Sequence, residues 1–128
     1  MSGSEIFMYA MLGIVAFFYI KRMVPQRSIT QYVPADIEER MKSGRSVLLD
    51  VRTAGERKSS LIQGSFHIPL HELSSRVNEL KKHNSKEIIC YCQSGSRSIS
   101  AASTLKKAGY TVANLRGGIA EWNFYKRS

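Results

Sequence analysis

The sequence predicts an α/β domain with a mainly parallel central sheet flanked by helices, preceded by one N-terminal hydrophobic helix. Three short apolar runs, suited to strands buried on both faces, lie at 47–51, 86–92 and 111–115. Helical patterns alternate with these runs, and this alternation is typical of a parallel sheet with helical crossovers. The long run Ile6–Ile20 carries no charge and is the most apolar part of the chain.

This first run is a candidate membrane anchor. As a helix it covers about 22 Å, and snorkelling by Lys21 and Arg22 extends it toward the roughly 30 Å of a hydrocarbon core. We expect residues 1–24 to form a single-pass transmembrane anchor. The basic flank places the domain that follows on the cytoplasmic side.

Two alternatives remain for this segment, a cleaved signal peptide and a helix buried in the core. A signal peptide is disfavoured because the preceding MSGSE contains no Lys or Arg and no small-x-small site follows the run. Pro25 starts a linker, 25–28, that we expect no helix to cross. The α/β domain then occupies 29–128.

Amphipathic helical patterns within the domain cover 34–42, 70–82 and 98–108. Apolar side chains recur in each at helical spacing, so each pattern predicts a helix with one buried face. Gly109 follows the last of them, and we expect it to cap the end of that helix.

The composition is that of a globular protein. The chain has 128 residues, 43% of them hydrophobic, and a formal net charge of +9. Its basic residues are scattered, and no aromatic side chains alternate with them. The charge therefore indicates a solvated surface that attracts small anions, and we expect no nucleic-acid binding.

The two cysteines, Cys90 and Cys92, are separated by a single residue. On a strand both side chains point to the same face, at a spacing that a regular strand does not allow to close as a disulfide. We expect Cys90 to be a buried small residue and Cys92 an exposed thiol, both reduced. Cys92 ends a predicted strand, and ligands of parallel sheets bind beyond such ends.

The loop after Cys92 is built to stabilise an anion. It contains small or flexible residues, Gln93, Ser94, Gly95 and Ser96. Such a backbone can curl so that its N–H groups point inward as a nest. A helix N-terminus and Arg97 add positive potential, which lowers the pKa of a thiol. We therefore predict that Cys92 is a nucleophile and not a residue that fills space.

The segment Cys92–Ser98, CQSGSRS, resembles the active-site loop of single-domain rhodaneses, the thiosulfate sulfurtransferase family. The family pattern is Cys, four residues, Arg, then Ser or Thr. Three more segments resemble the family in the same order, LDVRTAGE from Leu49, GSFHIPL from Gly64 and LRGGIAEW from Leu115. The resemblance covers nearly all of the chain after Ser28 and implies a rhodanese-like domain.

The resemblance implies sulfur transfer in two covalent steps. The Cys92 thiolate takes a sulfane sulfur from thiosulfate or a persulfide, and the enzyme persulfide passes it to cyanide or a thiol. The backbone of 93–97, with Ser98, would bind the persulfide. Asp50 and Arg97 are the expected supporting pair, although Asp50 could instead cap a loop.

Other charged residues supply further expectations. Arg52 is the second supporting residue that we predict, and Arg52 and Arg57 are candidates to guide an anionic donor. The histidines show no spacing typical of metal ligands, so we expect no metal site, and no motif indicates a cofactor. A protein partner for sulfur relay is compatible with the mechanism.

Two other functions remain. One is a catalytically idle rhodanese-like module that binds within a membrane complex. The other is phosphatase or arsenate reductase chemistry. Cysteine phosphatases use a wider Cys-x5-Arg loop, whereas four residues separate Cys92 from Arg97, so sulfur transfer is favoured.

Overall fold

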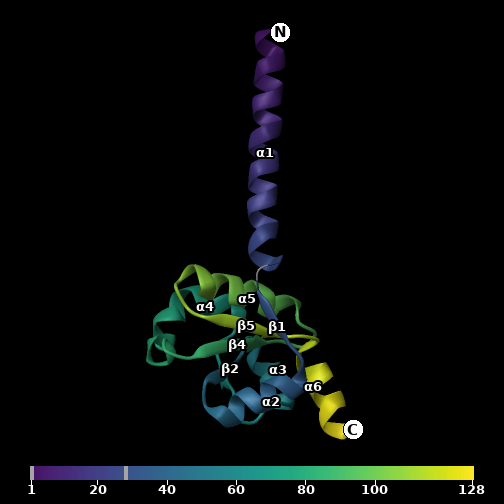
Figure 1. Ribbon diagram of the computed structural model, residues 1–128, viewed down its shortest axis with the longest axis vertical. Helices are drawn as coiled ribbons and strands as arrows, with labels where there is room; N and C mark the ends of the chain where they lie inside the picture. Colours follow the sequence, from purple (N-terminus) through teal and green to yellow (C-terminus); the bar gives the residue numbers. More distant parts are fainter. Residues whose placement is uncertain (1, 28) are drawn as a thin grey trace.

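The computed structural model describes residues 2–27 and 29–128. Its elements alternate along the chain as the sequence predicts (Figure 1). They are α1 (Gly3–Arg27), β1 (Thr30–Tyr32), α2 (Pro34–Ser43), β2 (Ser46–Asp50), α3 (Ala54–Ser59), β3 (Phe66–His67), α4 (Leu70–Arg76), the 3₁₀ helix η1 (Val77–His83), β4 (Glu87–Tyr91), α5 (Ser96–Lys107), β5 (Val112–Leu115) and α6 (Gly118–Arg127).

The five strands form one sheet in the order β1-β5-β4-β2-β3, and every neighbouring pair is parallel. This confirms the predicted fold class. Strands β2 and β4 lie side by side at the centre, with Asp50 opposite Tyr91. The residues that follow them, Val51 and Cys92, therefore emerge together at the carboxyl edge of the sheet.

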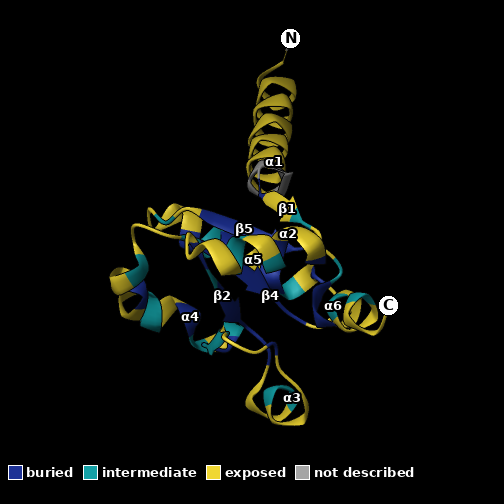
Figure 2. Cartoon of the chain, turned by 60° about the horizontal axis from the view of Figure 1, so that its bottom comes forward, coloured by how far each residue is buried: buried dark blue, intermediate teal, exposed yellow. Residues whose placement is uncertain are grey.

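Each face of the sheet carries its own apolar cluster. On one face, α4, η1 and α5 cover the first cluster, which includes Leu73, Leu80, Leu105 and both cysteines. On the other face, α2 and α6 cover the second cluster. Figure 2 shows the strands as the buried centre of the domain. Ile29 belongs to the first cluster. The chain that follows α1 therefore enters the domain on the face of the sheet that α5 covers.

Helix α1 extends away from the domain, and its residues up to Arg22 are exposed (Figures 1 and 2). Its segment Gly3–Arg22 is long and apolar enough to cross a membrane, and none of it is buried, so it is not a core helix. The helix continues through Pro25 to Arg27, where we expected a linker. Pro25 lies in the last turn, where a proline removes a backbone hydrogen bond only near the helix end. Ser28 lies outside the described residues.

Two of the predicted helices end in ways that the structure explains. The predicted helix 70–82 changes to 3₁₀ geometry after Arg76. In this geometry residues three apart share one side, which places Val77 and Leu80 together toward the core. At the end of α5, Gly109 has a φ of +98°, and the N–H groups of Gly109 and Tyr110 bond to Lys106 and Leu105. This Schellman motif confirms the predicted cap.

Candidate active site

Cys92 directly follows β4, and the next residues curl around its sulfur. The Gly95 N–H donates to Cys92 Sγ at 3.0 Å, and Ser98 Oγ lies 3.3 Å from the same sulfur. Gly95 has a φ of +111°, which L side chains rarely adopt, and a Cβ there would lie 3.4 Å from the Gly117 nitrogen. The glycine is therefore what lets the loop close tightly enough to aim its amides at the sulfur.

This arrangement makes the two cysteines chemically different. Burial raises the pKa of Cys92, but hydrogen bonds from Ser98, Gly95 and Ser94 outweigh burial and leave the pKa lowered. Burial and the charge of Cys92 raise the pKa of Cys90 to about 12. Both thiols are free. Of the two thiols, only Cys92 therefore has its pKa shifted toward the thiolate.

The Cys92 thiol is not exposed, contrary to our expectation. Its exposed fraction is 0%, as is that of Cys90. The reason lies in the same loop, because a backbone that brings its N–H groups to the sulfur also covers it.

The start of helix α6 is hydrogen-bonded to the backbone of the Cys92 loop. The N–H groups of Ile119 and Ala120 donate to the carbonyls of Cys92 and Gln93 at 2.9 and 3.2 Å. A Cβ on Gly118 would stand 2.5 Å from both carbonyl oxygens, so only glycine allows this approach. The loop carbonyls thus bond to α6 while loop N–H groups bond to the sulfur. The Gly-Gly pair belongs to the LRGGIAEW segment that resembles the family, but its close contact with the Cys92 loop was not predicted from the sequence.

Asp50 and Arg52 form a buried pair beside the site. Arg52 Nε and Nη2 bond to the two Asp50 oxygens at 3.0 and 2.9 Å. Arg57 and the Tyr91 hydroxyl complete the shell at 3.2 and 3.1 Å. Burial alone would raise the pKa of Asp50, but hydrogen bonds from Arg52 lower it below its usual value. Arg52 is 1% exposed and also bonds to the Ser60 carbonyl, so the expectation that it guides a donor at the surface is wrong.

Arg97 and Asp50, the two expected supporting residues, do not bond to each other. The two terminal nitrogens of Arg97 bond to the two oxygens of Glu56 at 2.7 and 2.8 Å, whereas Asp50 is occupied by other arginines. Glu56 opens α3 in a capping box with Thr53. The bond to Arg97 is the main cause that lowers the pKa of Glu56 to about 2. Asp50 and Arg97 are therefore parts of two separate ion pairs.

A pocket of about 290 Å³ opens beside Arg97. It is lined by Val51, Thr53, Pro69, Leu70, His71 and Arg97. Val51 belongs to the same apolar cluster as Cys92, and Leu70 packs against that cluster. A second hollow of about 440 Å³ has Ser94, Gly95, Asn114 and Arg116 among its lining residues. Residues that follow Cys92 in the chain therefore line both hollows, whereas Cys92 itself lines neither of these two.

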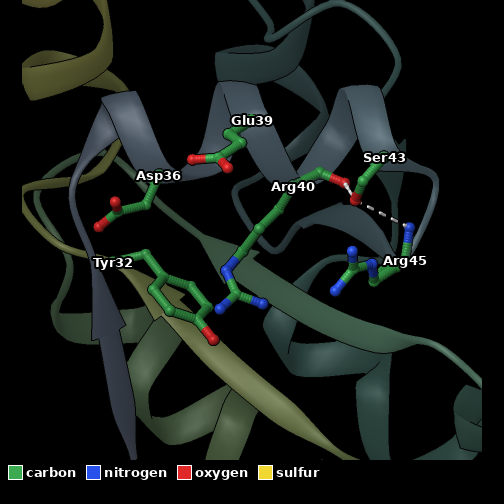
Figure 3. A pocket seen from close by; sticks show the side chains of 6 residues that line it. All are labelled: Tyr32, Asp36, Glu39, Arg40, Ser43 and Arg45. Carbon is green, nitrogen blue, oxygen red and sulfur yellow. Dashed lines mark hydrogen bonds between the residues drawn. The ribbon is translucent and has the colours of Figure 1, made fainter.

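The pocket in Figure 3 lies elsewhere and takes no residue from the Cys92 loop. Its Arg40 guanidinium stacks 4.1 Å from the Tyr32 ring centre, and both side chains bond to Glu87. Glu87 begins β4, whereas Cys92 follows the end of that strand. Among the described residues, no group of three or more His, Cys, Asp or Glu side chains could hold a metal ion.

Comparison with known proteins agrees with this geometry. The Rhodanese-like domain family matches residues 33–124. A protein named Sulfurtransferase from Allochromatium vinosum is 36% identical over 88 residues, which cover 67% of this chain and 80% of that protein. The human thiosulfate:glutathione sulfurtransferase is 30% identical over 100 residues, covering 68% and 87%. A crystal structure of thiosulfate sulfurtransferase from Pseudomonas aeruginosa gives a TM-score of 0.70 at 28% identity, covering 78% of this chain but only 20% of that one.

Proposed function

The chain belongs to the rhodanese-like domain family, and on that premise we propose that it is a sulfurtransferase that carries sulfur on Cys92. The observation that carries the proposal is the Cys92 sulfur itself, which accepts a backbone hydrogen bond at 3.0 Å and has a lowered pKa. Relatives named as sulfurtransferases support sulfur transfer in general. The donors we propose are thiosulfate or a persulfide, and the acceptors are a thiol or cyanide.

The proposed reaction has two displacement steps. In the first, the Cys92 thiolate attacks the sulfane sulfur of the donor. A new S–S bond forms, the donor's own bond to that sulfur breaks, and sulfite or a thiolate leaves with the electron pair. In the second, the acceptor attacks the outer sulfur of the enzyme persulfide, and the Cys92 thiolate is released as the leaving group.

The hydrogen-bond donors of the loop can stabilise Cys92 both as the free thiolate and as the persulfide. The amides of Ser94 and Gly95 and the hydroxyl and amide of Ser98 offset the negative charge on Sγ. Asp50 and Arg52 do not touch the sulfur. We assign them a positioning role, because they fix the end of β2 beside the end of β4.

We also propose that α1 is a membrane anchor that keeps the domain in the cytoplasm. Gly3–Arg22 has the length and composition of a span, and Lys21 and Arg22 follow its apolar part. Full-length protein should resist extraction by alkaline carbonate, and Phe17→Arg with Val15→Arg should release it. The orientation can be tested with a reporter that functions only outside the cytoplasm, fused after Ser128. Activity of this reporter would contradict the proposed orientation.

Intact-mass spectrometry tests the sulfur chemistry directly. After incubation with thiosulfate or a persulfide, the wild type should gain the mass of one sulfur atom. Cys92→Ser should gain nothing, and Cys90→Ala should behave as the wild type. An adduct on Cys92→Ser, or none on the wild type with either donor, would refute the proposal.

The complete burial of Cys92 favours a second candidate function, that of a catalytically idle module that binds a protein partner at the membrane. In that case the sulfur is only part of the core. The same measurement separates the two candidates, because an idle module forms no adduct with any sulfane donor while it still captures its partner.

A further inference from the structure

We propose that the domain lies with its α4–η1–α5 layer against the membrane, where a patch of lysines binds the headgroups of anionic phospholipids. The lysine patch consists of Lys81, Lys82, Lys86, Lys106 and Lys107. The inference rests on the proposal that α1 is a membrane anchor, and it is independent of sulfur transfer. It adds to the anchor a second, electrostatic contact with the lipid.

The chain enters the domain on the side of the sheet that carries these lysines. Helices α4 and α5 lie on the side of the sheet from which α1 extends, whereas α2 and α6 lie on the opposite side (Figure 1). Helix α1 is in contact with α5, and Ile29 packs into the apolar cluster that α5 covers. A membrane that holds α1 therefore faces the α4–η1–α5 layer.

The domain also begins close to the lipid. Lys21 and Arg22 follow the apolar part of α1, and the helix ends at Arg27. Residues 23–27 of a helix cover about 7.5 Å. The headgroup region adds about 5–7 Å outside the hydrocarbon core on each side of a bilayer. The near side of the domain is therefore at the level of the headgroups, within about one Debye length, 8 Å, of their charges.

Charge is distributed unevenly between the two helix layers. With histidines left aside, α4, η1 and α5 together contain six basic and two acidic side chains. Helices α2 and α6 contain four of each. The excess of positive charge thus lies in the layer that faces the membrane, where it complements the negative surface of a cytoplasmic leaflet.

Lysines that are scattered along the sequence come together in this layer. The Tyr110 hydroxyl donates to the Val77 carbonyl at 2.8 Å, which ties the chain after α5 to the start of η1. The Lys86 N–H donates to the His83 carbonyl at 2.9 Å. Burial lowers the pKa of His83, and the nearby charges of Lys82 and Lys86 lower it further. All five lysines of the patch are exposed.

The carboxylates of this layer are bonded to another residue. Glu72 and Glu79 both bond to Arg76, at 3.2 and 2.7 Å. Within the part of the chain that the structure describes, four members of the patch take part in no ion pair, namely Lys81, Lys82, Lys86 and Lys107. An ammonium group binds a phosphate as a compact charge. Each lysine close to an anionic leaflet strengthens attachment by about fivefold.

The patch and the candidate active site lie at opposite ends of α5. Cys92 precedes the start of this helix, and Lys106 and Lys107 belong to its last turn. A helix of 12 residues is about 18 Å long. Lipid bound at the patch therefore leaves the Cys92 loop away from the contact.

Amine footprinting tests the contact on full-length protein in lipid nanodiscs. One set of discs contains phosphatidylcholine alone, and in the other about a quarter of the lipid is phosphatidylglycerol. A water-soluble acetylating reagent is added, and mass spectrometry gives the rate at which each lysine reacts. Lys42 on α2 and Lys58 on α3 are exposed internal controls outside the patch.

In discs with phosphatidylglycerol, Lys81, Lys82 and Lys107 should react at least about threefold more slowly than in discs without it. About 1 M NaCl should remove this protection, because salt screens the attraction between exposed charges. Lys42 and Lys58 should react at the same rate in both kinds of disc.

Charge-reversal variants test which cations make the contact, with Lys86 as the reporter. The patch variant is Lys81→Glu/Lys82→Glu/Lys107→Glu. The control variant changes three exposed cations of α2, α3 and α6, and is Lys42→Glu/Lys58→Glu/Arg127→Glu. Lys86 should lose its protection in the patch variant and keep it in the control variant. Thermal unfolding checks that both variants are folded.

Three outcomes overturn the inference. They are equal protection of the patch and of the internal controls, protection that does not depend on phosphatidylglycerol, and protection of Lys86 that survives in the patch variant. A protein that does not copurify with the discs is a different result, because it refutes the membrane anchor itself and the inference with it.

Discussion

The hydroxyl of Ser98 lies 3.3 Å from the sulfur of Cys92, and both side chains are completely buried. Ser98 is in the first turn of α5, so the helix that follows the loop also supplies one of the groups that bond to the sulfur. In a dry environment each such bond has a large effect on whether the thiol ionises.

Ser98→Ala should raise the pKa of Cys92, because the thiolate loses one of its hydrogen-bond donors. A hydrogen bond to a charged group contributes about 1.5–3 kcal/mol, so alkylation by iodoacetamide near pH 7 should slow by about tenfold or more. Ser100→Ala, on the exposed side of the same helix, should react as the wild type. Equal rates for Ser98→Ala and wild type would show that the hydroxyl does not tune the thiol.

Gly118→Ala should disturb the Cys92 loop. The new Cβ would stand 2.5 Å from the carbonyl oxygens of Cys92 and Gln93, at a φ of +64°. Gly109→Ala is the matched control, since it has a φ of +98° and nothing within 4 Å. Both should lose about 1–2 kcal/mol of stability in urea through backbone strain. Only Gly118→Ala should lose more than this and also slow persulfide loading.

Arg52→Met should destabilise the domain strongly. Removal of one partner of a buried ion pair costs about 3–5 kcal/mol, because Asp50 keeps its charge with only Arg57 and Tyr91 beside it. Urea unfolding at neutral pH measures the loss. Arg45→Met, at an exposed arginine, should change stability by less than about 0.5 kcal/mol. Similar losses in both variants would contradict the assigned role of Arg52.

The Glu56 ion pair should appear in the acid stability of the domain. The pKa of Glu56 is about 2 when folded, against 4.5 as its ordinary value. A lowered folded pKa contributes stability above the unfolded pKa, and this contribution is lost as pH falls through the folded pKa. The difference in unfolding free energy between wild type and Glu56→Gln should be constant above about pH 5 and shrink from there to about pH 2. A difference that grows toward low pH would contradict the ion pair.

The long elements could be predicted from the sequence because their apolar patterns are strong. The buried strands β2, β4 and β5 and the helices α2 and α5 lie close to where we expected them. Strands β1 and β3 were missed because they have only three and two residues, none of them fully buried. So short a segment has too few side chains to show alternation.

The loop around Cys92 could also be predicted, but its ion pairs could not. Glu56 and Arg97 are 41 residues apart, and their contact depends on how α3 docks beside the loop. The pairing of Asp50 with Arg52 had a local signal. Residues two apart on a strand share a face, so an arginine placed there could follow its aspartate into the core. We predicted Arg52 as a supporting residue and also as a guide for an anionic donor, but we did not predict its ion pair with Asp50.

The Cys92 sulfur is stabilised mainly by hydrogen bonds from the loop and from the start of α5, and the charge of Arg97 also interacts with it. Dissolved salt weakens attraction between exposed ions separated by more than a Debye length, about 8 Å in physiological saline, but it scarcely reaches amides enclosed within a fold. The acidity of this thiol is therefore set mainly by chain geometry, and only the smaller contribution of the half-exposed Arg97 is open to screening by salt. Its pKa should therefore shift only slightly between dilute buffer and concentrated salt.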